Sequence, residues 1–277
     1  MILRIKQKLN NKYSLFRNGS SYRFIKKINA LRRVRDFVGG AYGTWQLSRF
    51  RLHGDGIHLV LLRKIVSKYK ITSIVETGTF LGYTTKLFAK EFPNLQIYTA
   101  EINKCFYRKA KKNLRRYDNI HLYNSTSPEF LNSIIKNKLV GNRPLFYLDA
   151  HWLDDWPLEK ELQIISRKLT SAVISIDDFK VEGDSRFVYD KYNGKECSLD
   201  LVNDNLGKNE YNLLFPNYSK DKIFKNKLFH PNLIGYVILF QNMVKEFNIL
   251  KNSIFVKTNY LDKSNMVNIR KVSAKKK

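Results

Sequence analysis

The chain has 277 residues, of which 43% are hydrophobic and 27% charged, with 18 Phe, 16 Tyr, three Trp and a formal net charge of +26. This length fits one large α/β domain with additions, and so many aromatic residues exclude a chain that is disordered throughout. No apolar run approaches the roughly 20 residues of a spanning helix, and two cysteines, Cys105 and Cys197, are too few for a disulfide framework or a structural zinc site.

The chain begins with a segment, 1–48, that we interpret as a basic helical N-terminal extension. Apolar residues recur at helical spacing within 22–38, and lysines and arginines fill much of the rest. Most of the net charge lies at the two ends, since 1–70 carries +15 and 243–277 carries +7. The basic start has no apolar core of the signal-peptide type. Because two cysteines are too few for a disulfide framework, we predict a reducing compartment and therefore a cytoplasmic protein.

Residues 49–277 are predicted to form the main domain, in which short β-rich runs alternate with amphipathic helices. The strands are expected at 71–76, 96–101, 120–124, 145–149 and 172–176, and the helices at 57–69, 83–91, 104–116, 128–137 and 157–169. This alternation predicts an α/β fold with a doubly wound, mostly parallel sheet.

The chain after the fifth strand has a different character. Residues 180–231 are expected to be an irregular insertion that serves as a lid over an acceptor molecule; a purely structural extension on the sheet is the alternative. Two further strands are expected at 235–241 and 253–258, and a Lys-rich tail, 262–277, closes the chain.

The first strand ends in a glycine-rich turn with the pattern E-x-G-x-x-x-G, formed by Glu76, Gly78 and Gly82. Ligands of open α/β sheets bind beyond the carboxyl ends of the strands. Two glycines allow the backbone to approach a ligand there, and the following helix offers free N–H groups. An ordinary strand-to-helix turn remains the alternative.

The second strand ends at Glu101, 25 residues after Glu76. A carboxylate at this place can accept both hydroxyls of a ribose. A ribose site without a compact pyrophosphate loop indicates a nucleoside that carries an amino acid, namely S-adenosylmethionine.

The fourth and fifth strands both end on carboxylates, at Asp149 and at Asp177 with Asp178. Neighbouring parallel strands bring such ends together, and converging carboxylates repel one another unless a cation neutralises them. Oxygen ligands alone suit Mg²⁺ or Ca²⁺. The alternative is that the three side chains only cap loops or a helix.

From Val75 to Phe179 the chain resembles the class I S-adenosylmethionine-dependent methyltransferases, and within them the metal-dependent enzymes of the catechol O-methyltransferase type. The motifs that carry the resemblance follow strands 1, 2, 4 and 5 in order. They are Glu76, Gly78, Gly82, Tyr83 and Thr84; Glu101, Ile102 and Asn103; Asp149, His151 and Trp152; and Asp177 and Asp178. The resemblance covers under half of the chain.

This resemblance implies a Rossmann-like fold and a role for each matching residue. The cofactor-binding set would be Glu76, Gly78, Thr79, Phe80, Gly82, Tyr83, Thr84, Glu101, Ser127 and Asp149, with Glu101 on the ribose and Ser127 near the adenine. Mg²⁺ would be held by Asp149, Asp177 and Asp178. The family's lysine base is replaced by Leu153, so His151, Asp149 and Asp154 become the catalytic candidates.

The predicted function is therefore S-adenosylmethionine-dependent O-methylation of a small-molecule or glycan hydroxyl, assisted by a divalent metal. Two alternatives stay open: a nucleic-acid methyltransferase, which the basic ends favour, and a non-methylating member of the fold. No N-P-P-Y or D-P-P-Y element follows the fourth strand, which makes nucleic acid the weaker partner. The basic segment 1–35 is compatible with attachment to an anionic membrane surface, and with a lid over the cofactor pocket.

Overall fold

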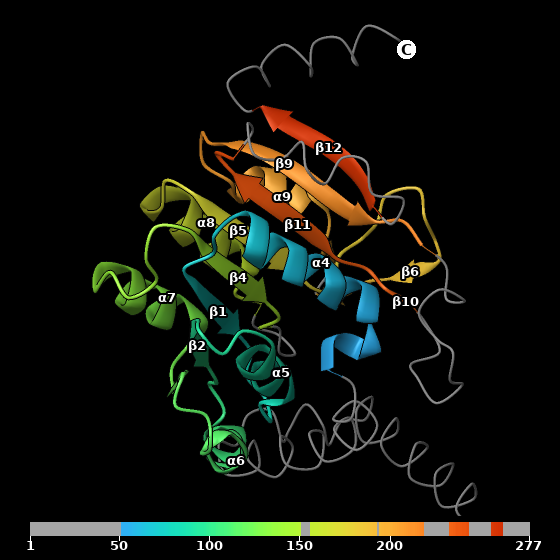
Figure 1. Ribbon diagram of the computed structural model, residues 1–277. Helices are drawn as coiled ribbons and strands as arrows, with labels where there is room; N and C mark the ends of the chain where they lie inside the picture. Colours follow the sequence, from blue (N-terminus) through green and yellow to red (C-terminus); the bar gives the residue numbers. More distant parts are fainter. Residues whose placement is uncertain (1–50, 151–155, 193, 219–232, 244–255, 263–277) are drawn as a thin grey trace, which may run out of the picture. The chain divides into compact units, whose positions relative to one another are not determined.

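The computed structural model describes residues 51–150, 156–192, 194–218 and 233–243, and the backbone of 256–262. Its main feature is an eight-stranded sheet in the order β12-β9-β11-β5-β4-β1-β2-β3 (Figure 1). The strands are β1 (Ser73–Thr77), β2 (Gln96–Ala100), β3 (Ile120–Tyr123), β4 (Pro144–Leu148), β5 (Ala172–Ile176), β9 (Glu210–Pro216), β11 (Val237–Gln241) and β12 (Val256–Asp262).

The first five strands are all parallel, and β1 lies between β2 and β4. β1, β4 and β5 are buried along their whole length, as expected of a parallel sheet that is covered on both faces. The predicted doubly wound, mostly parallel α/β fold is thereby confirmed. From β1 the strands are added outward to β3 on one side and then from β4 to β5 on the other, so the strand order switches between β1 and β4. Ligands of such sheets bind at this switch point.

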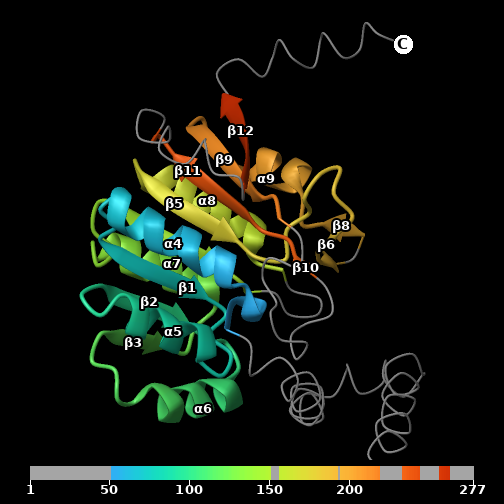
Figure 2. The ribbon, with the colours of Figure 1, turned by 45° about the vertical axis from the view of Figure 1, so that its right-hand side comes forward.

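Two groups of helices cover the sheet. α4 and α5 lie on one face, and α7, α8 and α9 pack side by side on the other (Figure 2). The helices are α4 (Gly56–Lys68), α5 (Tyr83–Glu91), α6 (Lys104–Leu114), α7 (Ser127–Lys136), α8 (Leu158–Lys168) and α9 (Leu199–Asn205), preceded by a short 3₁₀ helix, η1 (Arg51–Gly54). α4 begins at Gly56 because the side chain of Asp55 caps the helix by accepting from the N–H groups of Ile57 and His58. This helix start lies at the carboxyl edge of the sheet.

The far part of the sheet is antiparallel and corrects one expectation. β11 pairs with β5 and β9, and β9 pairs with β12. Residues 210–216, expected to be irregular, thus form an inner strand of the sheet, because the mostly apolar segment from Tyr211 to Phe215 is buried between two neighbouring strands. The strand expected at 253–258 is described over Val256–Asp262, and 253–255 lie outside the described residues.

The described part of the predicted insertion, up to Tyr218, contains regular elements that its sequence does not suggest. It contains β6 (Phe187–Val188), which pairs with β10 (Leu233–Ile234), and a small hairpin of β7 (Lys191–Tyr192) and β8 (Lys195–Glu196). Among the described residues, no helix is long and apolar enough to cross a membrane. The extension 1–48 and the tail beyond Asp262 lie outside the described residues, so their predicted roles stay predictions.

Candidate active site

Two left-handed glycines shape the turn after β1. Gly78 has a φ of 87° and Gly82 a φ of 78°. The N–H groups of Gly78 and Thr79 both donate to the carbonyl oxygen of Ala100 at 3.1 Å. A Cβ atom on Gly78 would lie 2.4 Å from the carbonyl oxygen of Asp149, so only glycine lets this turn come so close to the end of β4.

We expect Gly78→Ala to lower the free energy of unfolding by about 1–3 kcal/mol, because it adds both left-handed strain and a clash. Denaturant unfolding measures this loss. Gly183→Ala is the matched control, since Gly183 also has a positive φ, of 71°, but a Cβ there would have no atom within 4 Å. Equal losses in the two variants would show that the approach to Asp149 has no energetic importance.

Glu76 lies beneath the turn and is 1% exposed. Its Oε2 atom accepts from the hydroxyls of Thr85 at 2.5 Å and Thr99 at 2.6 Å. Burial raises the pKa of Glu76 to about 7, although both hydrogen bonds oppose the shift. Thr79 is also buried, and its hydroxyl oxygen lies 2.6 Å from that of Thr99. Both predicted cofactor residues therefore take part in the hydrogen bonds that hold β1, β2 and α5 together.

The other residues predicted around the turn are more accessible. Phe80 is half-buried, has a φ of 52°, and its ring lies 4.7 Å from that of Phe106. Thr84 is half-buried and Tyr83 is 37% exposed, both in the first turn of α5. A ligand at this edge can thus reach the start of α5, where backbone N–H groups lack helical partners.

Glu101 follows β2 and is 7% exposed. One carboxylate oxygen accepts from the N–H of Phe80 at 2.8 Å and the other from the N–H of Asn103 at 2.7 Å. Each oxygen keeps a second lone pair. Burial raises the pKa of Glu101 to about 7. The carboxylate is therefore fixed in place and still able to accept hydroxyl donors.

Two further residues, Ile102 and Ser127, follow the ends of β2 and β3. Ile102 is 53% exposed, more than any other large hydrophobic residue described, and the sequence motifs predicted no role of its own for it. Ser127 opens α7, and its buried Oγ has no hydrogen-bond partner among the described residues. An exposed apolar side chain and an unsatisfied buried hydroxyl close to the same strand ends suit an aromatic base with polar edges.

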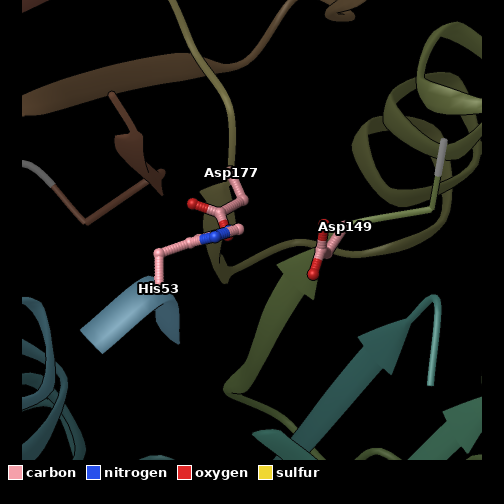
Figure 3. A group of neighbouring side chains, drawn as sticks. All are labelled: His53, Asp149 and Asp177. Carbon is pink, nitrogen blue, oxygen red and sulfur yellow. The ribbon is translucent and has the colours of Figure 1, made fainter. Parts of the chain in front are cut away.

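At the ends of β4 and β5, three side chains converge. The backbone N–H of Asp149 donates to the Thr77 carbonyl and that of Asp177 to the Leu148 carbonyl, at 3.1 Å each, which extends the sheet by one residue. His53 reaches the same place from η1, and Figure 3 shows its ring directed at Asp177 with Asp149 beside them. The ligand atoms of His53, Asp149 and Asp177 all lie within 4.8 Å of one another.

The charges of this group are strongly coupled. Nε2 of His53 lies 2.9 Å from Oδ2 of Asp177, an oxygen that also accepts from the hydroxyl of Tyr147. Burial would raise the pKa of Asp177, but His53, His58 and the hydroxyl of Tyr147 together outweigh burial and lower the pKa to about 2. Burial likewise opposes protonation of His53, yet Asp177, together with Asp178 and Asp149, raises the pKa of His53 to about 10. Without a bound cation, an imidazolium therefore neutralises part of this acidic edge.

Asp178, predicted as a metal ligand, is not part of this group of atoms. It has a left-handed backbone with a φ of 51°, and its carbonyl oxygen accepts from the N–H of Asp190 at 3.0 Å. Asp178 lies instead on a small adjoining cavity, together with Asp177, Asp190, Glu161 and Trp156. No lysine or arginine occurs among the described residues that line this cavity, and its volume is about 10 Å³, so it suits a cation or a single water.

The predicted lid contributes to the same cavity. The hydroxyl of Tyr192 donates to Asp190 at 2.8 Å, and its ring lies 5.5 Å from that of Trp156. An aromatic pair beside carboxylates suits a sugar or an aromatic ring. The catalytic candidates His151 and Asp154 lie outside the described residues.

His53 was not predicted from the sequence, because it stands far from the other motifs. A signal was present, since His53-Gly54-Asp55-Gly56 places an N-cap residue at the start of the helix before β1. That helix start lies at the carboxyl edge of the sheet, so the residue just before it belongs to the same edge.

No family model matches the chain, and no curated protein matches it. The solved structures that resemble it include three proteins named as methyltransferases. A protein from Staphylococcus aureus, provisionally named a caffeoyl-CoA O-methyltransferase, is 16% identical with a TM-score of 0.47, over 86% of this chain and 99% of that one. A provisionally named O-methyltransferase from Klebsiella pneumoniae is 19% identical with a TM-score of 0.45, over 66% and 78%. The precorrin-6y C5,15-methyltransferase of Geobacter metallireducens is 15% identical with a TM-score of 0.38, over 65% and 86%.

Proposed function

We propose that this chain transfers the methyl group of S-adenosylmethionine to a hydroxyl of a small molecule or glycan, with the help of a divalent cation. The main support for the proposal is that two sets of side chains with different chemistry lie at the carboxyl edge of the same sheet. Glu101, Ile102 and Ser127 suit a nucleoside, and His53, Asp149 and Asp177 suit a cation a few strands away. The acidic cavity with Trp156 and Tyr192 adjoins the second surface.

The described residues fit the cofactor. The carboxylate of Glu101 would accept the ribose hydroxyls, and the unsatisfied Oγ of Ser127 would meet a polar edge of the adenine. Exposed Ile102 would cover the face of the base, and the first turn of α5, with Tyr83 and Thr84, would receive the amino-acid end. When bound, the cofactor would supply a methyl group on a sulfonium, whose C–S bond would break as an acceptor oxygen attacks the methyl carbon in line, with S-adenosylhomocysteine as the leaving group.

The donor set also fits a cation, because one imidazole and two carboxylates can surround a divalent ion. Tyr147 would hold the Asp177 carboxylate by its hydrogen bond, a support typical of metal ligands. A nitrogen ligand favours first-row ions such as Mn²⁺, Fe²⁺ or Zn²⁺ over the Mg²⁺ that the sequence predicted, since Mg²⁺ prefers oxygen. Such an ion lowers the pKa of a bound hydroxyl.

The chain's own residues would then orient the acceptor and remove its proton. Trp156 and Tyr192 would pack against the acceptor ring, and Asp178 and Asp190 would accept from its hydroxyls. His151 and Asp154 remain the proposed bases on sequence grounds. Positioning of this kind supplies much of the rate enhancement in a displacement reaction.

Transfer of a labelled methyl group tests the proposal. The full chain, incubated with methyl-labelled S-adenosylmethionine and panels of catechols and glycans, should label a hydroxyl-bearing acceptor, and EDTA should stop the transfer. Cofactor binding with no transfer to any acceptor would favour a non-methylating member of the fold. Transfer that continues unchanged in EDTA would remove the cation from the proposal and leave the methyltransferase.

A further inference from the structure

Between the two basic ends, the chain contains a further concentration of positive charge. Residues 104–116 contain seven lysines and arginines and no acidic residue. They form α6 and the two residues after Leu114, and Phe106, Ala110 and Leu114 point into the core. All seven basic residues are exposed. This face of α6 is therefore entirely cationic or polar.

Some of these side chains surround a hollow next to α5. Its lining consists of Lys86, Lys112, Asn113, Arg115 and Arg116, and its volume is about 250 Å³. Four of the five residues are cations and none is an acid. In the part of the chain that the structure describes, none of the four forms an ion pair. The charges of the hollow thus repel one another and attract an anion.

The hollow has fixed walls. The side-chain amide of Asn113 donates to the carbonyl oxygen of Leu81 at 3.0 Å, which ties α6 to the glycine turn. The Lys86 ammonium lies 5.9 Å above the centre of the Tyr117 ring. Gly82 lies so close to Leu114 that an added Cβ would come within 2.8 Å of it. The cations are therefore presented by two helices whose separation is set by packing.

Helix stability does not account for this arrangement. Basic residues in the last turn of α6 interact favourably with the helix dipole, which explains Lys111 and Lys112. It does not explain Lys86, which comes from the first half of α5. On an ordinary charged surface, basic side chains also pair with acidic ones. Arg63 of α4, for example, forms an ion pair with Glu91 of α5 at 2.5 Å.

We propose that the hollow between α5 and α6 binds the phosphate backbone of a single-stranded nucleic acid. α6 is about 16 Å long, enough to follow several phosphates of a strand. A membrane surface is the less suitable partner, because helices that lie on membranes bury an apolar face. The large exposed hydrophobic residues described are Val60, Tyr83, Ile102 and Leu139, and none of them lines the hollow.

Fluorescence anisotropy with labelled oligouridine, measured over a series of NaCl concentrations, tests this surface. We expect the fourfold variant Lys86→Gln, Lys112→Gln, Arg115→Gln and Arg116→Gln to bind at least tenfold more weakly at low salt. The slope of log K against log salt should also become shallower by about 2–3, since each phosphate neutralised on a single strand contributes about 0.7. Thermal unfolding of each variant shows whether its fold is kept.

The matched control changes four exposed lysines on other surfaces, Lys64, Lys68, Lys136 and Lys160, to glutamine and so removes the same net charge. The slope of log K against log salt for this control should stay close to that of the natural chain, apart from a small effect of the lower total charge. Equal losses in the two fourfold variants would overturn the proposal, because total charge would then explain the binding. So would binding to phosphatidylglycerol vesicles that depends on the hollow while oligouridine binding does not. The outcome is separate from methyl transfer, because no residue of the hollow belongs to the proposed active site.

Discussion

Glu101→Gln should weaken S-adenosylmethionine binding by about tenfold or more in calorimetry. The substitution removes a charge-assisted acceptor from the ribose hydroxyls, and such contacts contribute about 1.5–3 kcal/mol, where 1.4 kcal/mol is a factor of ten. Gln is a conservative choice, because its carbonyl oxygen can keep one of the two backbone hydrogen bonds that Glu101 accepts from Phe80 and Asn103. The fold of the turn should therefore survive.

The pH dependence of binding provides a second measurement on the same residue. Hydroxyl donors favour the ionised carboxylate, and burial raises the pKa of Glu101 to about 7 without cofactor. Affinity should thus increase as the pH rises through 7 and level off above it. Glu101→Gln should flatten this profile. Glu76 also has a pKa of about 7, so a profile that keeps its shape in the variant would assign the dependence to Glu76.

The control for this prediction is Glu210→Gln, which changes an exposed carboxylate on β9. Its cofactor affinity should match that of the natural chain. Native affinity in Glu101→Gln as well would contradict the ribose role of Glu101 and, with it, the methyltransferase proposal.

Periodicity predicted the parallel part of the fold closely because each element there has a simple pattern. The helix expected at 83–91 is α5 residue for residue, and 172–176 is β5. β9 was missed because Asn212 interrupts its apolar run, and a polar residue in a short segment is typical of a loop. Asn212 is nevertheless 4% exposed, so pairing with β11 and β12 overrides the local pattern.

The candidate site was predictable where its residues stand directly after strands. Asp149, Asp177 and Glu101 each end a β-rich run, and the topology of a parallel sheet then brings them to one edge. His53 could not be placed in this way, because it precedes the first strand and reaches the edge through the path of η1 and α4. The helix start at Asp55 indicates that His53 lies at this edge, but not that its ring approaches Asp177, 124 residues away in the sequence.

The cation site can be tested at Asp149. We expect Asp149→Asn to lower the affinity for Mn²⁺ at least tenfold and to reduce methyl transfer by more than a hundredfold, because it removes one of two carboxylate ligands while keeping the shape of the side chain. The loss of the six-line electron paramagnetic resonance signal of free Mn²⁺ reports binding directly, without any assay of activity. Asp149→Asn is preferred to Asp177→Asn, because Asp177 is buried against His53 and Tyr147, and breaking that pair would also destabilise the fold.

The same spectroscopy decides whether His53 is a ligand or only a counter-charge. A nitrogen ligand predicts a ¹⁴N coupling to bound Mn²⁺ that disappears in His53→Ala and changes when histidine is labelled with ¹⁵N. His121→Ala is the control, since Nε2 of His121 is hydrogen-bonded to Oε1 of Gln96 at 2.7 Å, away from this edge. A coupling that persists in His53→Ala would exclude His53 as the nitrogen ligand. If neither Asp149→Asn nor His53→Ala changed the affinity for Mn²⁺, the group would be an ion pair and not a metal site, because removing a true ligand lowers metal affinity.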